Sequence, residues 1–268
     1  MSKIKTKEEI QIHKDETMSN LSSFLDTLIQ TPTDAKRADL ISYWLKDFQL
    51  YISQEKSFDA SKIKSYKRGD VIKVNLGFNI GSEQGGLRYA IVLDKNNKHN
   101  SKTITVIPLT SIKEEKKIYE RDVDLGRELY NRLKSKYDTA LEKLNKERDK
   151  YNNTLNTAQL LLNALKSISP KDDTEQSVEH AITHTQKFIT SQTEVLNALQ
   201  DEETYLERIK FELQRMKDGS IAKIEQITTI SKQRIFDPKG SKDVLSGIQF
   251  SNVTMDKIND KIKELYIF

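Results

Sequence analysis

The sequence predicts an α+β protein in which a β-rich domain carries helices at its N-terminus and is interrupted by a long helical hairpin. The nine glycines of the 268-residue chain leave residues 1–68 and 127–218 without any. Glycine-free segments rich in Leu, Lys and Glu favour helix, whereas the glycine-bearing stretches carry Val, Ile and Thr in runs typical of strands. With 36% hydrophobic and 31% charged residues, the chain is also too polar for one compact globule of this length.

Residues 1–65 are expected to form a small helical segment. Apolar residues recur at three- and four-residue spacing over Met18–Leu28 and again over Leu40–Tyr51, which is the period of an amphipathic helix. Pro32 separates the two runs, and the Thr33–Asp34 pair offers a cap for the second helix. We expect these helices to pack on the main domain rather than to hold a ligand.

The next segment, residues 66–125, changes to a strand pattern, and residues 219–268 resume it after the glycine-free insertion. Both contain β-branched and alternating apolar residues bounded by turn-forming residues. The expected strands are residues 71–76, 89–94, 103–109, 221–227 and 231–235, and a closing helix is expected from about residue 254 to residue 265.

Residues 126–218 are expected to form a long antiparallel coiled-coil insertion. Apolar residues approximate a heptad seam from Leu129 to Leu165 and again from Ile182 to Leu213, and Pro170 supplies a turn between the two arms. Arms of about 40 residues, at about 1.5 Å per residue, would project roughly 60 Å. Because this insertion interrupts the β-rich domain, its two ends must lie close together.

Composition and charge exclude several classes of protein. The chain has no cysteine, so disulfides, thiolate metal sites and cysteine nucleophiles are excluded. The net charge of +4 permits RNA or another anionic partner without requiring one. No apolar run reaches the roughly 18 residues of a membrane span, so we expect a cytoplasmic protein that does not enter a membrane. His180 and His184 share a helical spacing but lack a third metal ligand nearby, so surface histidines are expected there.

The loop from Gly81 to Arg88 is the most informative stretch of the chain. It holds three glycines in eight residues and ends in an arginine, whose planar guanidinium suits phosphate. Strand follows the loop, which excludes both the P-loop and the dinucleotide-binding fingerprint because each requires a helix at that point. Taken alone, the loop fits an ordinary hairpin connection as well as a site for a phosphate backbone.

The residues around this loop resemble a known family. The segment from Arg68 to Arg88 closely resembles the opening of MazF/PemK/Kid-type toxins, the ribonuclease half of bacterial type II toxin–antitoxin modules. The resemblance continues in Ile107–Ser111 and, beyond the insertion, in Ile224–Ile235. It implies an SH3-like β-barrel of the MazF/CcdB type, assembled from the segments before and after the insertion. It also implies a homodimer that cleaves single-stranded RNA without metal or cofactor and that is held in check by an antitoxin protein.

The same resemblance implies the site residues. Arg88 and Thr110 occupy the positions of the catalytic pair. A guanidinium can donate two hydrogen bonds to phosphoryl oxygens and a hydroxyl a third, as RNA cleavage to 2′,3′-cyclic phosphate and 5′-hydroxyl ends requires. The residue that would remove the proton of the 2′-hydroxyl is not identified, because arginine is a poor base. The positions implied to bind RNA, or alternatively to brace the loop, are Ser82, Glu83, Gln84, Gly85, Gly86, Ser111 and Gln226.

Two residues depart from the family pattern. Tyr89 stands where proline commonly follows the arginine, and Thr228 replaces the usual arginine after Glu-Gln-Ile. The alternative to an active nuclease is therefore a catalytically inactive MazF/CcdB-fold module that acts by binding protein or RNA, although the presence of Arg88 and Thr110 argues against it. For the helical insertion we expect a role in recognising an antitoxin, a second copy or a host or phage factor, or in guarding the RNA groove.

Overall fold

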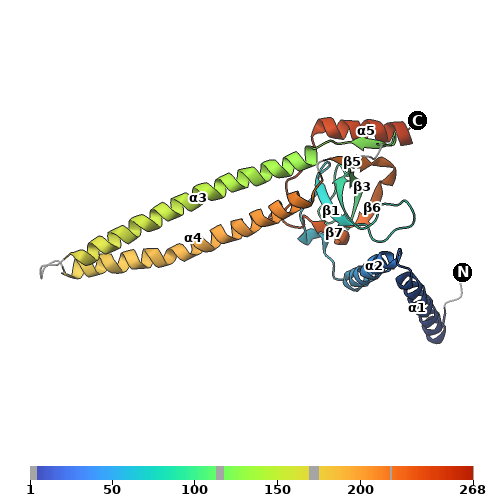
Figure 1. The fold of residues 1–268 in the computed structure, drawn as a ribbon, viewed down its shortest axis with the longest axis horizontal. Coiled ribbons are helices and arrows are strands. Elements are labelled where there is room, and N and C mark those ends of the chain that lie inside the picture. The colour runs from blue at the N-terminus through green and yellow to red at the C-terminus, as the bar shows by residue number, and fades with distance from the viewer. Residues whose placement is uncertain (1–4, 113–117, 169–174, 218, 268) are drawn as a thin grey trace.

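The computed structural model describes residues 5–112, 118–168, 175–217 and 219–267. It shows an antiparallel sheet with a pair of helices on one side, a long helical hairpin projecting on another, and a closing helix beside the end strand β4 (Figure 1). The fold is therefore α+β, as predicted. The described helices are α1 (Lys7–Gln30), α2 (Ala35–Gln54), α3 (Glu128–Ser167), α4 (Glu175–Arg215) and α5 (Asn252–Tyr266). None of them is long and apolar enough to cross a membrane.

The sheet follows the order β4-β5-β3-β2-β1-β7, and β6 pairs with β3 off this path. The strands are β1 (Val71–Asn75), β2 (Leu87–Val92), β3 (Thr103–Ser111), β4 (Asp122–Asp124), β5 (Ser220–Lys223), β6 (Thr228–Ser231) and β7 (Ile235–Asp237). The path ends at β4 and β7, and within the described residues no pairing joins these two strands. The predicted β-barrel is thus not closed by strand pairing, because the end strands, three residues each, pair only with β5 and β1.

Alternation along the strands divides the buried side chains between two faces of the sheet. On β2, Ile91 joins one apolar cluster while its neighbours Ala90 and Val92 join the other. The first cluster is completed by α5, through Met255 and Ile258, and by the bases of the long helices. The strands are therefore positioned by burial on both faces, as expected of a sheet between two apolar layers.

The long helices replace the turn of the β4–β5 hairpin. The Ser220 amide donates to the Gly126 carbonyl at 3.0 Å, and the Leu125 amide donates to the Ser220 carbonyl at 3.0 Å. The ends of the insertion therefore meet, as predicted. Helices α3 and α4 have 40 and 41 residues, close to the predicted arm length, and they run antiparallel (Figure 1). The predicted turn at Pro170 lies outside the described residues.

The base of this hairpin is part of the sheet's own core. Leu129, Leu133 and Ile209, here called the hairpin root, are each at most 1% exposed and belong to the cluster that covers β1, β2 and β3. One turn further out, Lys136 Nζ donates to the carbonyl oxygens of Val244 at 2.8 Å and Ser246 at 2.7 Å. Burial lowers the pKa of Lys136 to about 8. The hairpin is consequently anchored by apolar packing against the sheet and by this half-buried amine.

Packing between α3 and α4 weakens with distance from the root. A second cluster joins Leu144 to Leu199 and Leu206, all at most 6% exposed. Beyond it, the seam residues Leu162 and Leu165 are only half-buried, and Leu196 is 39% exposed. The apolar seam predicted from the sequence therefore covers the proximal half well and the distal half only in part.

The two N-terminal helices and the closing helix are present as predicted, but α1 and α5 begin earlier than expected. Helix α1 begins earlier than expected, where Thr6 and Glu9 form a reciprocal capping box. Helix α2 begins after Asp34, where the prediction placed it, but the Asp34 side chain makes no capping hydrogen bond. The closing helix α5 begins two residues earlier than expected, where the Ser251 hydroxyl accepts a hydrogen bond from the Thr254 amide.

The strand predicted at residues 231–235 is wrong. This segment is a 3-10 turn, Lys232–Arg234, that connects β6 to β7. The Ser231 hydroxyl accepts a hydrogen bond from the Gln233 amide at 3.2 Å and so caps the turn, in the manner in which serine competes with strand pairing. The strand predicted at 221–227 likewise stops at Lys223, where a 3-10 turn over Ile224–Gln226 begins.

Candidate functional site

The glycine-rich loop is the connection between β1 and β2. Its ends are joined because the Gly86 amide donates to the Gly77 carbonyl at 2.6 Å. Gly77, Gly81 and Gly86 have φ angles of +82°, +62° and +75°, which other residues rarely adopt. At Gly85, a Cβ would lie 2.9 Å from the Gly77 carbonyl oxygen. The glycines are therefore required by this loop's backbone, as the sequence predicted.

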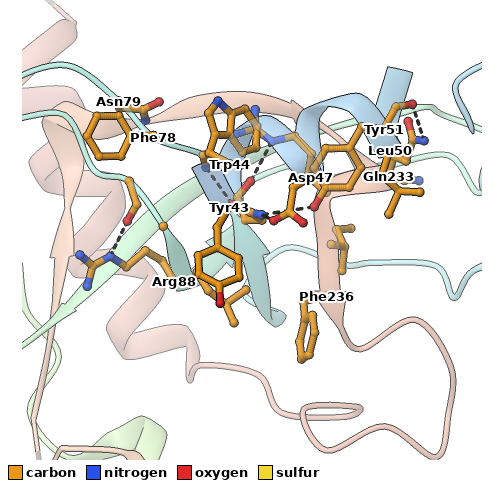
Figure 2. Close-up of a pocket in the computed structure, with 18 of the residues that line it drawn as sticks. Tyr43, Trp44, Asp47, Leu50, Tyr51, Phe78, Asn79, Arg88, Gln233 and Phe236 are labelled. Carbon is orange, nitrogen blue, oxygen red and sulfur yellow. Dashed lines mark hydrogen bonds between the residues drawn. The ribbon is translucent and has the colours of Figure 1, made fainter. Parts of the chain in front are cut away.

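Arg88 leaves this loop as the second residue of β2. Its side chain is exposed, and its Nε donates to the Gly85 carbonyl oxygen at 2.9 Å. This bond fixes the direction of the guanidinium (Figure 2). Among the described residues, no group is hydrogen-bonded to the two terminal nitrogens of Arg88. The guanidinium is thus held through Nε, and its two terminal nitrogens are available to donate hydrogen bonds to a ligand.

Thr110 lies on β3, the strand that neighbours β2. The β2–β3 register pairs Ala90 with Pro108, where the ladder ends. Arg88 and Thr110 each lie two residues beyond this last pair, at the same end of the two strands. Thr110 is half-buried and pairs through its backbone with Ile221 of β5. The structure therefore brings the two positions of the expected catalytic pair to one end of two adjacent strands.

Three of the residues expected to bind RNA meet in a polar groove beside this end. A cavity of about 450 Å³ is lined by Glu83, Gln84 and Gln226, together with Pro108 and Thr228. The Gln84 amide donates to Gln226 Oε1 at 3.2 Å, a contact that joins the loop to the segment beyond the hairpin. The sequence alone could not establish this contact, because 142 residues separate its two ends.

The other expected residues are distributed differently. Gly85 and Gly86 line a second, larger cavity together with Arg88. Ser82 is exposed at the tip of the loop and Ser111 is half-buried at the end of β3. Neither serine lines either cavity. The structure therefore divides the predicted set between two neighbouring hollows that share the glycine-rich loop.

The larger cavity, about 930 Å³, lies between α2 and the sheet (Figure 2). Helix α2 is tied to the sheet there: Asn75 Nδ2 donates to Asp47 Oδ2 at 2.7 Å, and Gln233 Nε2 donates to the Tyr51 carbonyl oxygen at 2.9 Å. Trp44 covers Gly77, where a Cβ would come within 2.7 Å of its ring. Sequence reasoning assigned α2 only a packing role. The available signal was its density of aromatic residues, Tyr43, Trp44, Phe48 and Tyr51.

The two departures from the family pattern have different surroundings. The Tyr89 hydroxyl donates to the Glu212 carboxylate of α4, and Lys73 Nζ lies 2.5 Å from the same carboxylate. Burial raises the pKa of Tyr89, so this donor stays protonated. At the position where the family commonly has proline, Tyr89 therefore makes a contact between β2 and the long helix α4. Thr228 is half-buried in the polar groove, where Arg234 also contributes to the wall.

His180 and His184 lie on the exposed surface of α4, with ring centroids 4.8 Å apart. Among the described residues, no group of three or more His, Asp or Glu side chains is arranged to hold a metal ion. These histidines take no part in the arrangement around Arg88.

Comparison with known families finds a match that covers β1 to β4 and runs into the long helices. Residues 67–184 match the family model of the PemK-like, MazF-like toxin of type II toxin–antitoxin systems. The match begins just before β1 and includes Arg88 and Thr110. No curated protein matches the chain. The antiparallel sheet with its covering helices agrees with a MazF-like fold. This part of the chain, from just before β1 into α4, therefore carries the match to the PemK-like, MazF-like toxin of type II toxin–antitoxin systems.

Proposed function

We propose that the chain is the toxin of a type II toxin–antitoxin module and that it is a metal-independent endoribonuclease acting on single-stranded RNA. The observation that carries this proposal is the open guanidinium of Arg88, at the same strand end as Thr110 and next to the loop whose Gln84 contacts Gln226. The family assignment supports the same function.

In the proposed reaction the 2′-oxygen of the RNA bonds to phosphorus while the bond from phosphorus to the 5′-oxygen breaks. The 2′-hydroxyl loses a proton and the 5′-oxygen gains one, giving a 2′,3′-cyclic phosphate and a 5′-hydroxyl. Negative charge builds up on the phosphoryl oxygens as the bonds change. The terminal nitrogens of Arg88 can donate two hydrogen bonds to these oxygens, and the Thr110 hydroxyl can donate a third. No residue is assigned as the general base.

The polar groove is proposed to hold the RNA strand on either side of that phosphate. Glu83, Gln84 and Gln226 offer carboxylate and amide groups that can read base edges. Ser82, Gly85, Gly86 and Ser111 are proposed to contact the backbone of the RNA or to support the loop. The positive charge missing at Thr228 is partly replaced by Arg234, which lines the same groove.

The finer architecture is also part of the proposal. We assign the sheet to the SH3-like barrel of MazF and CcdB proteins, in two segments, 66–125 and 219–268, after an N-terminal segment 1–65. We assign the helical insertion, 126–218, to an antiparallel coiled coil that binds an antitoxin or another protein. A homodimer acting in the cytoplasm is proposed as the working form. The agreement in element order and the family assignment support these assignments.

The test is cleavage of a single-stranded RNA by the purified protein without added divalent metal, with the ends identified chemically. We expect cleavage to 2′,3′-cyclic phosphate and 5′-hydroxyl ends, and a loss of roughly 100- to 1,000-fold in rate for Arg88→Ala, the range for removing one charge-stabilising donor. Arg208→Ala is the matched control, because Arg208 is half-exposed on α4 and 3.5 Å from Asp243. Equal rates for Arg88→Ala and wild type would overturn the proposal.

The second candidate is a non-catalytic module of the same fold that binds RNA or protein. The observation that favours it is the replacement of the family arginine by Thr228, which removes a positive charge from the groove. Under this alternative the wild type would bind single-stranded RNA or a protein target without producing new ends. Restoration of cleavage by Thr228→Arg would assign the loss of activity to this position.

A further inference from the structure

We propose that the cavity between α2 and the sheet binds one unpaired nucleobase of the RNA, adjacent to the phosphate held by Arg88. The inference rests on the proposed function, since it takes an RNA strand to be present at Arg88. It adds a subsite whose outer wall is α2, a helix that lies before the residues matched by the family model.

The position of the cavity relative to Arg88 is the first argument. The cavity of about 930 Å³ has Gly85, Gly86 and Arg88 on its sheet side and the side chains of α2 on the other. This volume is in the range of sites for small ligands. A nucleotide whose phosphate contacts Arg88 carries its base into a neighbouring hollow. The polar groove lined by Gln84 is the neighbour of this cavity, since Asn79, Glu83 and Arg234 line both hollows.

The second argument is the exposure of aromatic rings that face into the cavity. Tyr43 is 62% exposed and Phe236 is 64% exposed, although both line a concave surface. Figure 2 shows their rings projecting from α2 and β7 into the space beside Arg88. Open aromatic faces in a hollow next to a cation are typical of sites for unpaired bases, which stack on aromatic rings while an arginine or lysine holds the backbone.

Contacts within the protein hold α2, from which Tyr43 projects, and other aromatic residues of the cavity wall. The Arg234 guanidinium lies over the Trp44 ring at 5.2 Å, and the Arg37 guanidinium lies over the Phe78 ring at 5.9 Å. The hydrogen bond between Asn75 and Asp47 fixes α2 against β1. The wall is thus organised by contacts within the protein itself, which lowers the conformational entropy lost on binding.

The third argument is that polar acceptors remain open beside the rings. Asn79 donates through Nδ2 to the Gln84 carbonyl oxygen, and Gln233 donates through Nε2 to the Tyr51 carbonyl oxygen. Within the described part of the chain, the side-chain oxygens of both amides have no hydrogen-bond donor. Side-chain oxygens can accept from the exocyclic amino groups of adenine, cytosine or guanine. Lys239 also lines the cavity and adds a positive charge.

The experiment uses a fluorescent single-stranded oligonucleotide that contains the site cleaved by the wild type. A 2′-deoxy nucleotide at that site blocks attack, and equilibrium titration gives Kd. A set of oligonucleotides then carries a single abasic residue at successive positions. We expect one position next to the cleavage site at which loss of the base weakens binding to the wild type by roughly 5- to 100-fold, the range for one stacked base.

Tyr43→Ala is expected to bind the intact oligonucleotide more weakly by a similar factor, and to show a change of less than about two-fold when the base at that position is also removed. Tyr43→Phe, which keeps the ring, should bind as the wild type does. The matched control is Tyr266→Ala, since Tyr266 is 54% exposed on α5 and lines neither the cavity nor the groove. Far-UV circular dichroism checks that each variant is folded.

Equal affinity of Tyr43→Ala and wild type for the intact oligonucleotide, in a protein that cleaves RNA, would overturn this inference alone. A wild type that neither cleaves nor binds RNA would overturn the proposed function with it. Light scattering covers the remaining case: if Tyr43→Ala loses RNA affinity only because its molecular mass falls to that of a monomer, the cavity is a contact between two copies and the inference is wrong.

Discussion

Replacing Gly77 by alanine is expected to separate α2 from the glycine-rich loop. Gly77 has a φ angle of +82°, and a Cβ at this position would lie 2.7 to 2.9 Å from three atoms of the Trp44 ring. Gly81, four residues further along the same loop, has a φ angle of +62°, but a Cβ there would meet no atom within 4 Å. Gly81→Ala is therefore a matched control that reproduces the backbone cost without the contact with Trp44.

The size of the effect follows from these two contributions. A left-handed backbone costs a non-glycine residue about 1–2 kcal/mol, and both variants incur it. Forcing a methyl group into a packed contact costs about 1–3 kcal/mol more, and only Gly77→Ala incurs this because the Trp44 ring must move. We therefore expect Gly77→Ala to be destabilised by about 2–5 kcal/mol and Gly81→Ala by about 1–2 kcal/mol.

Urea denaturation followed by circular dichroism measures the two free energies of unfolding. The fluorescence of Trp44, the single tryptophan of the chain, reports the contact directly, and its emission should shift to longer wavelength in Gly77→Ala only. In a Trp44→Ala background the two glycine substitutions should cost the same, because the ring that distinguishes them is gone. Equal destabilisation and unchanged emission in the presence of Trp44 would refute the reasoning.

Two further predictions concern the long hairpin. Deleting residues 153–197 and joining the ends with a short Gly-Ser linker should leave a cooperative thermal transition, whereas deleting 127–217 removes the hairpin root. Burial of the three side chains of the hairpin root contributes ~5–9 kcal/mol, which is comparable to the whole stability of a domain. The protein with the larger deletion should therefore not fold, and a normal thermal transition for it would contradict this prediction. For Lys136, whose folded pKa is lowered to about 8, the unfolded state binds more protons between about pH 8 and 10.5, so stability should rise with pH there relative to Lys136→Met. Urea denaturation from pH 7 to 9.5 measures this difference, and a constant difference would contradict it.

Much of the architecture could be predicted because it depends on local pattern. The glycine-free stretch with its apolar repeat predicted two helices of about 40 residues, and α3 and α4 have 40 and 41. The Thr33–Asp34 pair marked the start of α2. Short strands were predicted less well: β4 has three residues, and no strand was predicted there. So short a strand exists only through its pairing with β5, which lies beyond the hairpin.

The candidate site likewise combines features that are local in the sequence with contacts between distant segments. The sequence alone indicated a loop whose backbone needs glycine and which ends in an arginine suited to phosphate. Both are local properties of the chain. The tertiary structure decided what surrounds Arg88. The Gln84–Gln226 contact and the docking of α2 over Gly77 join segments that are distant in sequence. Such contacts depend on the packing of whole elements, and no periodicity within one segment records them.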